Sequence, residues 1–219
     1  MTNKIIPYVC PYTGENLVLD KDKYISISKR TFKIKNHIPR FCEEDNYTES
    51  FGLQWNLFNR TQLDSFCDIK LSHNRFWAQT GWDPKTLDNL NILEVGSGAG
   101  RFTEAFLDAT NSNLYSVDYS SAVEANFKNN YKFRSRLNLC QASIYEMPFK
   151  DNSFDKCFCF GVLQHTPSFE KSIESLVKKV KFNGEIVVDF YPIKGFYTKI
   201  QAKYFLRPIT NRLPKKTLL

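Results

Sequence analysis

Apolar and polar positions alternate in blocks along the second half of the chain. Five short apolar runs, bounded by turn residues, occur at residues 91–95, 113–117, 136–141, 153–160 and 185–190. Runs of this length, rich in β-branched and aromatic residues, are typical of buried strands. Between the runs, apolar residues at helical spacing predict helices over residues 101–109 and from about Ser168 to Asn183. This succession of strands and helices predicts an α/β fold.

The first forty residues follow a different pattern. Short apolar stretches at 17–19, 24–28 and 32–34 are separated by polar turns. Such spacing predicts three short strands joined by tight connections. We therefore expect a separate small β module over residues 1–42.

Residues 43–90 connect this module to the first long strand. Two stretches dense in aromatic residues, 51–58 and 75–82, flank apolar positions at helical spacing, so one or two helices are expected. The aromatic side chains either cover the sheet or form a lid over a ligand, with Arg75 available for a carboxylate. The pattern leaves both interpretations open.

A glycine-rich turn lies between the run at 91–95 and the helix after it. Gly96, Gly98 and Gly100 stand at every second position. A strand, a glycine turn and a helix together bind nucleotide-like ligands at the helix N-terminus. A dinucleotide site needs its third glycine one residue later, where this chain has Arg101. Glu94, just before the turn, would repel a pyrophosphate but suits a cationic ligand.

The stretch Glu94-Val95-Gly96-Ser97-Gly98-Ala99-Gly100 resembles the first motif of class I S-adenosylmethionine-dependent methyltransferases, of the type-11 domain found in ubiquinone and menaquinone biosynthesis. The resemblance extends over about residues 88–191. It implies a Rossmann-like sheet with strand order 3-2-1-4-5, spanning residues 91–193, and S-adenosyl-L-methionine as the cofactor. In this stretch it implies that the cofactor-binding residues are Glu94, Gly96, Ser97, Gly98 and Gly100.

Further candidate cofactor residues follow the second and third strands. Asp118 comes 22 residues after Gly96, close to the spacing of an acidic residue that holds a ribose diol. Tyr119 is expected to lie against the adenine. In the next motif Ser143 replaces the Asp that the family uses for the adenine amino group, and Ile144 is expected to contact the ring.

The run at 153–160 and the loop after it resemble the family's fourth motif. Its last residue, Phe160, is expected to contact the cofactor, and the pair Gln164-His165 replaces a common His-His pair. The resemblance brings His165 close to the reacting methyl group. It is either a general base for a substrate hydroxyl or a loop residue that packs against or caps the helix beginning near Ser168.

These residues predict an S-adenosylmethionine-dependent methyltransferase. By resemblance the methyl acceptor is a hydroxyl group of a small molecule, a sugar or a lipid-linked intermediate. A non-catalytic cofactor-binding or regulatory module is the alternative, because Ser143 weakens the adenine contact. A nicotinamide-dependent oxidoreductase is disfavoured by Arg101 and Glu94. Signatures of base-directed methylation are missing, so no nucleic-acid substrate is expected.

The N-terminal module also resembles a known motif. Cys10-Pro11-Tyr12-Thr13-Gly14 is similar to the start of a zinc-ribbon-like module that precedes some methyltransferases. A structural zinc needs four ligands, but the other three positions fall near Thr13, Ile25 and Ser28. We therefore expect no bound metal.

Charge is concentrated at the end of the chain. Residues 194–219 hold seven Lys and Arg and no acidic residue, which accounts for the whole net charge of +7. Phe196, Ile200 and Tyr204 lie at roughly helical spacing, so this basic amphipathic tail is expected to pack on the sheet, contact a second chain in a homodimer, or lie on an anionic membrane. Only 29 residues follow the fifth run, too few for the family's last helix and hairpin.

Two further patterns concern location. No apolar run approaches the ~20 residues of a membrane span, and the first residues lack the apolar core of a signal peptide. A cytoplasmic protein is expected.

Overall fold

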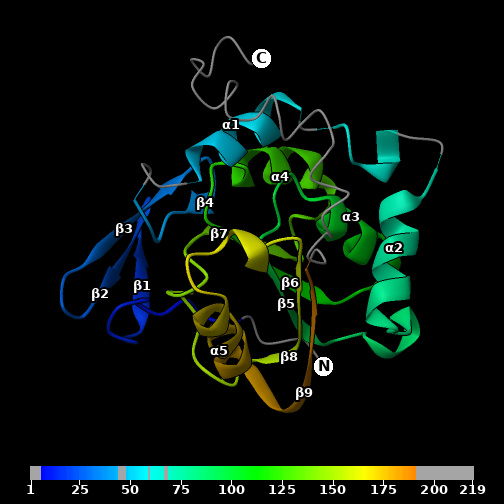
Figure 1. Ribbon diagram of the computed structural model, residues 1–219. Coiled ribbons are helices and arrows are strands. Elements are labelled where there is room, and N and C mark those ends of the chain that lie inside the picture. Colours follow the sequence, from blue (N-terminus) through cyan, green and yellow to red (C-terminus); the bar gives the residue numbers. More distant parts are fainter. Residues whose placement is uncertain (1–5, 44–47, 59, 67–68, 191–219) are drawn as a thin grey trace.

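The computed structural model describes residues 6–43, 48–58, 60–66 and 69–190 (Figure 1). Its centre is a five-stranded sheet in which every neighbouring pair is parallel. The order is β7-β6-β5-β8-β9, which confirms the predicted Rossmann-like order 3-2-1-4-5. The strands are β5 (Asn91–Val95), β6 (Asn113–Asp118), β7 (Leu137–Gln141), β8 (Phe154–Phe160) and β9 (Val180–Asp189).

Five α-helices are present in the described part of the chain. They are α1 (Glu49–Leu57), α2 (Leu71–Thr80), α3 (Arg101–Ala109), α4 (Val123–Asn129) and α5 (Phe169–Lys179). Short 3₁₀ turns lie at η1 (Asp64–Phe66), η2 (Pro84–Thr86), η3 (Tyr131–Phe133) and η4 (Leu163–His165). The helices predicted before the first long strand are therefore present as α1 and α2.

The last helix ends earlier than the sequence suggests. The apolar spacing predicts a helix as far as Asn183, but α5 ends at Lys179 and β9 begins at Val180. Val180 is buried and pairs with Phe154 at the start of β8. Its apolar side chain therefore packs in the sheet and not on a helix face. The spacing of apolar residues alone cannot distinguish the last turn of a helix from the first residue of a strand.

Alternating strand residues divide the core between the two faces of the sheet. Ile92 and Phe158 pack with the aromatic residues of α2 and α3. Their neighbours Leu93 and Cys157 pack on the other face, against α5 and the N-terminal module. Strands covered on both faces are apolar throughout, which explains why the runs were continuous in the sequence. Figure 1 shows α2 and the module on opposite sides of the sheet.

The N-terminal module is an antiparallel sheet of β1 (Leu17–Asp20), β2 (Lys23–Ser26), β3 (Thr31–Lys35) and β4 (Ile38–Pro39). Its first three strands lie where the sequence predicts them. Within the described ranges, no group of three or more His, Cys, Asp or Glu side chains is arranged to hold a metal ion.

This module is joined to the main sheet rather than set apart from it. Arg40 and Gln141 form an isolated parallel β-bridge, in which the Phe41 amide donates to the Gln141 carbonyl at 2.8 Å. Tyr8 and Phe41 pack in the same core as Phe149 of the main domain. Residues 142–153, all of which the structure describes, contain no helix. The module therefore covers the sheet face that this crossover leaves open.

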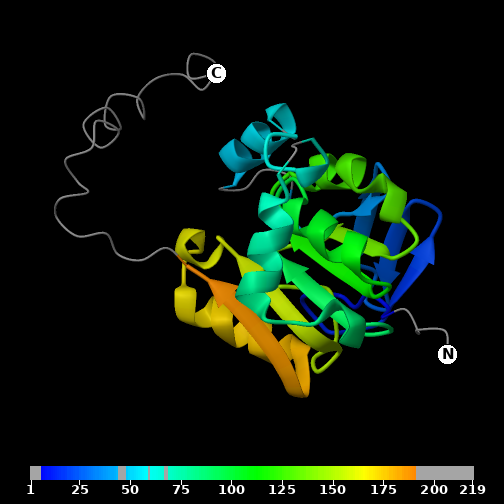
Figure 2. The ribbon, with the colours of Figure 1, turned by 90° about the vertical axis from the view of Figure 1, so that its right-hand side faces the viewer.

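Helix α1 lies at the top of the molecule in both views, next to α4 (Figure 1, Figure 2). Among the described helices, none has the length and apolar content needed to cross a membrane. The predicted tail helix at residues 196–206 lies outside the described residues, as does any hairpin after β9.

Candidate active site

A cavity of about 380 Å³ lies where the carboxyl ends of β5, β6 and β8 meet α1 and α2. Its volume falls within the range of small-molecule sites, and ligands of open α/β sheets bind at this end of the strands. Its walls come from four stretches that the sequence singled out, namely the glycine turn, the end of β6, the segment after β7 and the segment after β8.

The glycine turn forms the floor of the cavity. Gly96, Ser97 and Gly98 all line it. Gly98 has φ +53°, and a Cβ at this position would point toward the indole of Trp55, 3.6 Å away. The turn thus brings bare backbone to the cavity beneath an aromatic side chain.

Gly100 has a different structural role. It precedes α3 with φ +88°, and a Cβ there would collide with Asn126 and Asn130 of the α4 region. Its missing side chain allows α3 to begin against α4. Gly100 therefore shapes the turn and does not form part of the cavity lining, unlike the other two glycines of the motif.

Asp118, the last residue of β6, lines the cavity and closes the turn. Its Oδ2 accepts from the Gly98 amide at 2.7 Å, and its Oδ1 accepts from the Ser120 amide at 2.8 Å and hydroxyl at 2.6 Å. Burial raises the pKa of this carboxyl. A carboxylate has about four acceptor positions, so three internal bonds leave about one for a ligand hydroxyl.

Glu94 lies beneath the glycine turn and does not reach the cavity wall. Its side chain is 2% exposed, and Oε2 accepts from Thr103 Oγ1 at 2.6 Å and Ser116 Oγ at 2.7 Å. Burial raises its pKa to about 7. The carboxyl therefore links Thr103 of α3 to Ser116 of β6 and lies outside the cavity lining.

The wall after β6 and β7 carries Tyr119, Ala142 and Ile144. Ser143 lies between the last two but outside the lining, and its hydroxyl accepts from the Tyr145 amide at 3.2 Å. The structure therefore brings Tyr119 and Ile144 together, as predicted, and leaves Ser143 aside. Ala142 was missed because a small apolar residue after a strand gives no chemical signal.

The opposite wall follows β8. Phe160, Val162 and His165 line it, and His165 lies in η4 with its amide donating to the Val162 carbonyl at 2.8 Å. The His165 side chain is exposed at this wall. The N-cap of α5 is Ser168, whose hydroxyl accepts from the Lys171 amide.

The connection before the sheet contributes both a cover and a cavity wall. Phe76 of α2 is fully buried in the core, whereas Trp55 of α1 lines the cavity. Arg75 also lines it, but its guanidinium pairs with Asp189 at 2.5 Å. Asp189 also accepts from the Gly161 amide. The carboxylate expected for Arg75 is thus supplied by the end of β9, which the sequence pattern did not indicate.

Comparisons with known proteins agree with this geometry. Residues 93–188, which contain the glycine turn, Asp118 and η4, match the methyltransferase domain family. Over this stretch the chain is similar to a methyltransferase domain. The cofactor of the family is S-adenosyl-L-methionine.

Among curated relatives, the tRNA U34 carboxymethyltransferase of Nautilia profundicola is 27% identical over 131 residues, which are 55% of this chain and 43% of that protein. The ubiquinone/menaquinone biosynthesis C-methyltransferase UbiE of Rickettsia akari is 28% identical over 185 residues, 78% of this chain and 73% of that protein. The chain thus spans less than half of the first relative.

Among solved structures, an S-adenosylmethionine-dependent methyltransferase from Methanococcus maripaludis has a TM-score of 0.53 at 15% identity, and the match covers 68% of each chain. At this identity the likeness concerns the fold.

The residues present suit the cofactor. Gly98 leaves a space at the cavity floor that a side chain would fill. Ser97 Oγ is buried on the same floor without a hydrogen-bond partner among the described residues. Asp118 retains an acceptor position. Together these groups would hold a polar ligand against bare backbone at the N-terminal end of α3.

Proposed function

We propose that the protein is an S-adenosylmethionine-dependent methyltransferase that transfers the methyl group to a hydroxyl of a small molecule, a sugar or a lipid-linked intermediate. The observation that supports it is one cavity with two unlike walls. The glycine turn and Asp118 form one wall, and Phe160 and His165 form the other.

The bound cofactor supplies a methyl group on a sulfonium, which is already a good leaving group. The protein then mainly contributes position and orientation for an in-line displacement. Gly96 and Gly98 would hold the methionine part by their backbone, Asp118 would accept from the ribose, and Tyr119 and Ile144 would enclose the adenine. His165 takes the proton from the acceptor hydroxyl as its oxygen attacks.

The acceptor class is argued from the second wall of the cavity. The relatives include a C-methyltransferase and a carboxymethyltransferase. Transfer to a hydroxyl rests on His165 at the second wall, because a general base is what a hydroxyl nucleophile needs. No nucleic-acid partner forms part of the proposal, and the cytoplasmic location stays a prediction.

The test compares His165→Ala with His37→Ala, since His37 is an exposed histidine of the N-terminal module away from the cavity. Each protein is incubated with methyl-labelled S-adenosylmethionine and a small-molecule extract. Calorimetry with S-adenosylhomocysteine checks the cofactor site. We expect label transfer to fall by about 10²- to 10⁴-fold in His165→Ala, with cofactor affinity and the His37→Ala rate unchanged.

Three other outcomes would change the proposal. If methyl transfer persists in His165→Ala, His165 is not the general base. Cofactor binding without transfer in the unaltered protein favours the non-catalytic module. Binding of NAD in place of S-adenosylhomocysteine would favour the oxidoreductase, against which the family match already stands.

A further inference from the structure

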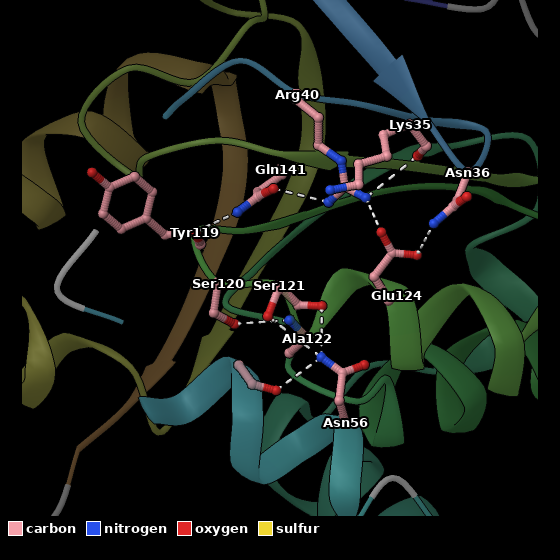
Figure 3. Close-up of polar contacts among 11 residues, drawn as sticks. Lys35, Asn36, Arg40, Asn56, Tyr119, Ser120, Ser121, Ala122, Glu124 and Gln141 are labelled. Atoms are coloured by element: carbon pink, nitrogen blue, oxygen red, sulfur yellow. Dashed lines mark hydrogen bonds and ion pairs between the residues drawn. The ribbon is translucent and has the colours of Figure 1, made fainter. Parts of the chain in front are cut away.

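A buried arginine joins the N-terminal module to the main domain. Arg40, just after β4, is 8% exposed. Its Nη1 donates to Gln141 Oε1 at 2.8 Å, and its Nη2 forms an ion pair with Glu124 of α4 and donates to the Lys35 carbonyl at 3.3 Å. Figure 3 shows the guanidinium between these groups. A buried charge needs such partners to offset its lost hydration.

The contact continues from Arg40 to the cavity. Gln141 is the last residue of β7 and is 3% exposed. While its Oε1 accepts from Arg40, its Nε2 donates to the Tyr119 carbonyl at 3.0 Å (Figure 3). Because Arg40 can only donate, it fixes which end of the Gln141 amide faces Tyr119.

The loop that begins at Tyr119 is also held from the other side. Asn56 of α1 donates from Nδ2 to the Ser121 carbonyl at 3.0 Å and to the Gly52 carbonyl at 2.8 Å (Figure 3). A Cβ on Gly52 would lie 2.3 Å from Ser121 Oγ, so α1 and the loop are in close contact. The loop is therefore fixed between α1 and the contacts of Arg40.

Docking of the module does not by itself require Arg40. The module already shares an apolar core with the sheet through Tyr8, Phe32 and Phe41, and a buried ion pair adds little net stability compared with an apolar replacement. What the polar contacts add is a fixed geometry, because both Nη atoms of Arg40 and both ends of the Gln141 amide have directional partners, while Arg40 Nε has none among the described residues. The residue at the end of these contacts is Tyr119, which lines the cavity.

We propose that Arg40 and Gln141 are positioning residues for the cofactor, and that the N-terminal module is thereby a working part of the adenosine site. This inference rests on the proposed function, because it assigns the adenine to Tyr119. Neither residue lines the cavity, so both act through the backbone of Tyr119.

The decisive variant is Gln141→Glu. The carboxylate still accepts from Arg40, so the module stays docked, but the donor to the Tyr119 carbonyl is lost. We expect the Kd of S-adenosylhomocysteine to rise about 3- to 10-fold, the range for one hydrogen bond. The melting temperature should fall as well, because a buried carboxylate then faces the Tyr119 carbonyl, so circular dichroism checks that the variant is folded. Arg40→Met should raise the Kd by a similar factor. The double variant should equal the single ones, because residues in one network are not additive.

The matched control is Arg30→Met, which removes an exposed arginine of the same module and should leave the Kd unchanged. Arg40→Lys restores one donor and should recover part of the affinity. An unchanged Kd in folded Gln141→Glu would overturn the inference. Failure of the unaltered protein to bind S-adenosylhomocysteine would instead overturn the proposed function.

Discussion

The wall of the cavity built by β5 and β6 is closed by internal hydrogen bonds, whereas the wall built by α1, η4 and the end of β8 carries exposed side chains. Asp118 has three internal donors, and Glu94 beneath it has two. On the other wall, the side chain of His165 is exposed, as is that of Gln54 in α1.

This difference separates two kinds of binding. Groups held by backbone and buried hydrogen bonds are preorganised, so they suit a ligand that is always the same, such as a cofactor. Side chains on short helices and loops are easier to change and to move, and they suit recognition of the second substrate. We therefore interpret the first wall as the cofactor wall and the second as the acceptor wall.

The largest effect on cofactor affinity is expected at the cofactor wall. Asp118→Ala should weaken S-adenosylhomocysteine binding by roughly 1.5–3 kcal/mol, the range for hydrogen bonds that involve a charge. Part of this loss comes from the turn, because the Gly98 amide also loses its acceptor. Calorimetry measures the affinity.

Asp151→Ala is the control for this experiment, since Asp151 forms an exposed ion pair with Lys179 on the surface. It should leave the affinity unchanged. If Asp118→Ala folds and binds as tightly as the unaltered protein, the first wall is not the cofactor wall and the comparison between the walls fails.

The cofactor wall could be predicted from the sequence because its determinants are local. A glycine turn after a strand, and an acidic residue at the end of the next strand, each follow from short-range spacing. Sheet order and the positions of Gly98, Asp118 and Tyr119 at the cavity agree with that prediction. The structure places Glu94 and Gly100 outside the cavity lining, and spacing alone does not show which side of the turn faces the cavity.

The remaining features depend on contacts between distant segments. Asp189 pairs with Arg75 across 114 positions, and Arg40 contacts Gln141 across 101. No pattern within a window of the sequence reports such pairs. The module was expected to be separate for the same reason, since its docking surface is formed by the end of β7 and by Phe149.

A smaller effect is expected at Trp55, where the two walls meet. Its indole lies beside Gly98, so α1 covers the cavity floor. Trp55→Ala should raise the Kd of S-adenosylhomocysteine about 3- to 10-fold, because one aromatic contact is lost while the turn is intact. Trp77→Ala is the control, as Trp77 packs on Phe106 away from the cavity. A loss as large as that of Asp118→Ala would place α1 in the cofactor wall.

The smallest effect on cofactor binding is expected at Glu94, where the change concerns folding. Because burial raises its pKa to about 7 from 4.5, the folded protein binds a proton between these values that the unfolded chain does not. The free energy of unfolding contributed by this group is therefore largest at low pH and is lost as the pH rises to about 7. Glu94→Gln keeps an oxygen acceptor for Thr103 and Ser116 but does not titrate.

Urea denaturation of both proteins between about pH 5 and pH 8 tests this directly. Relative to the unaltered protein, Glu94→Gln should gain stability as the pH rises through that window, and the gain should level off above about pH 7. Using the difference between the two proteins removes the contributions of all other carboxyls. A difference that is constant with pH would mean that Glu94 does not titrate in this window, which contradicts a pKa of about 7 in the folded protein.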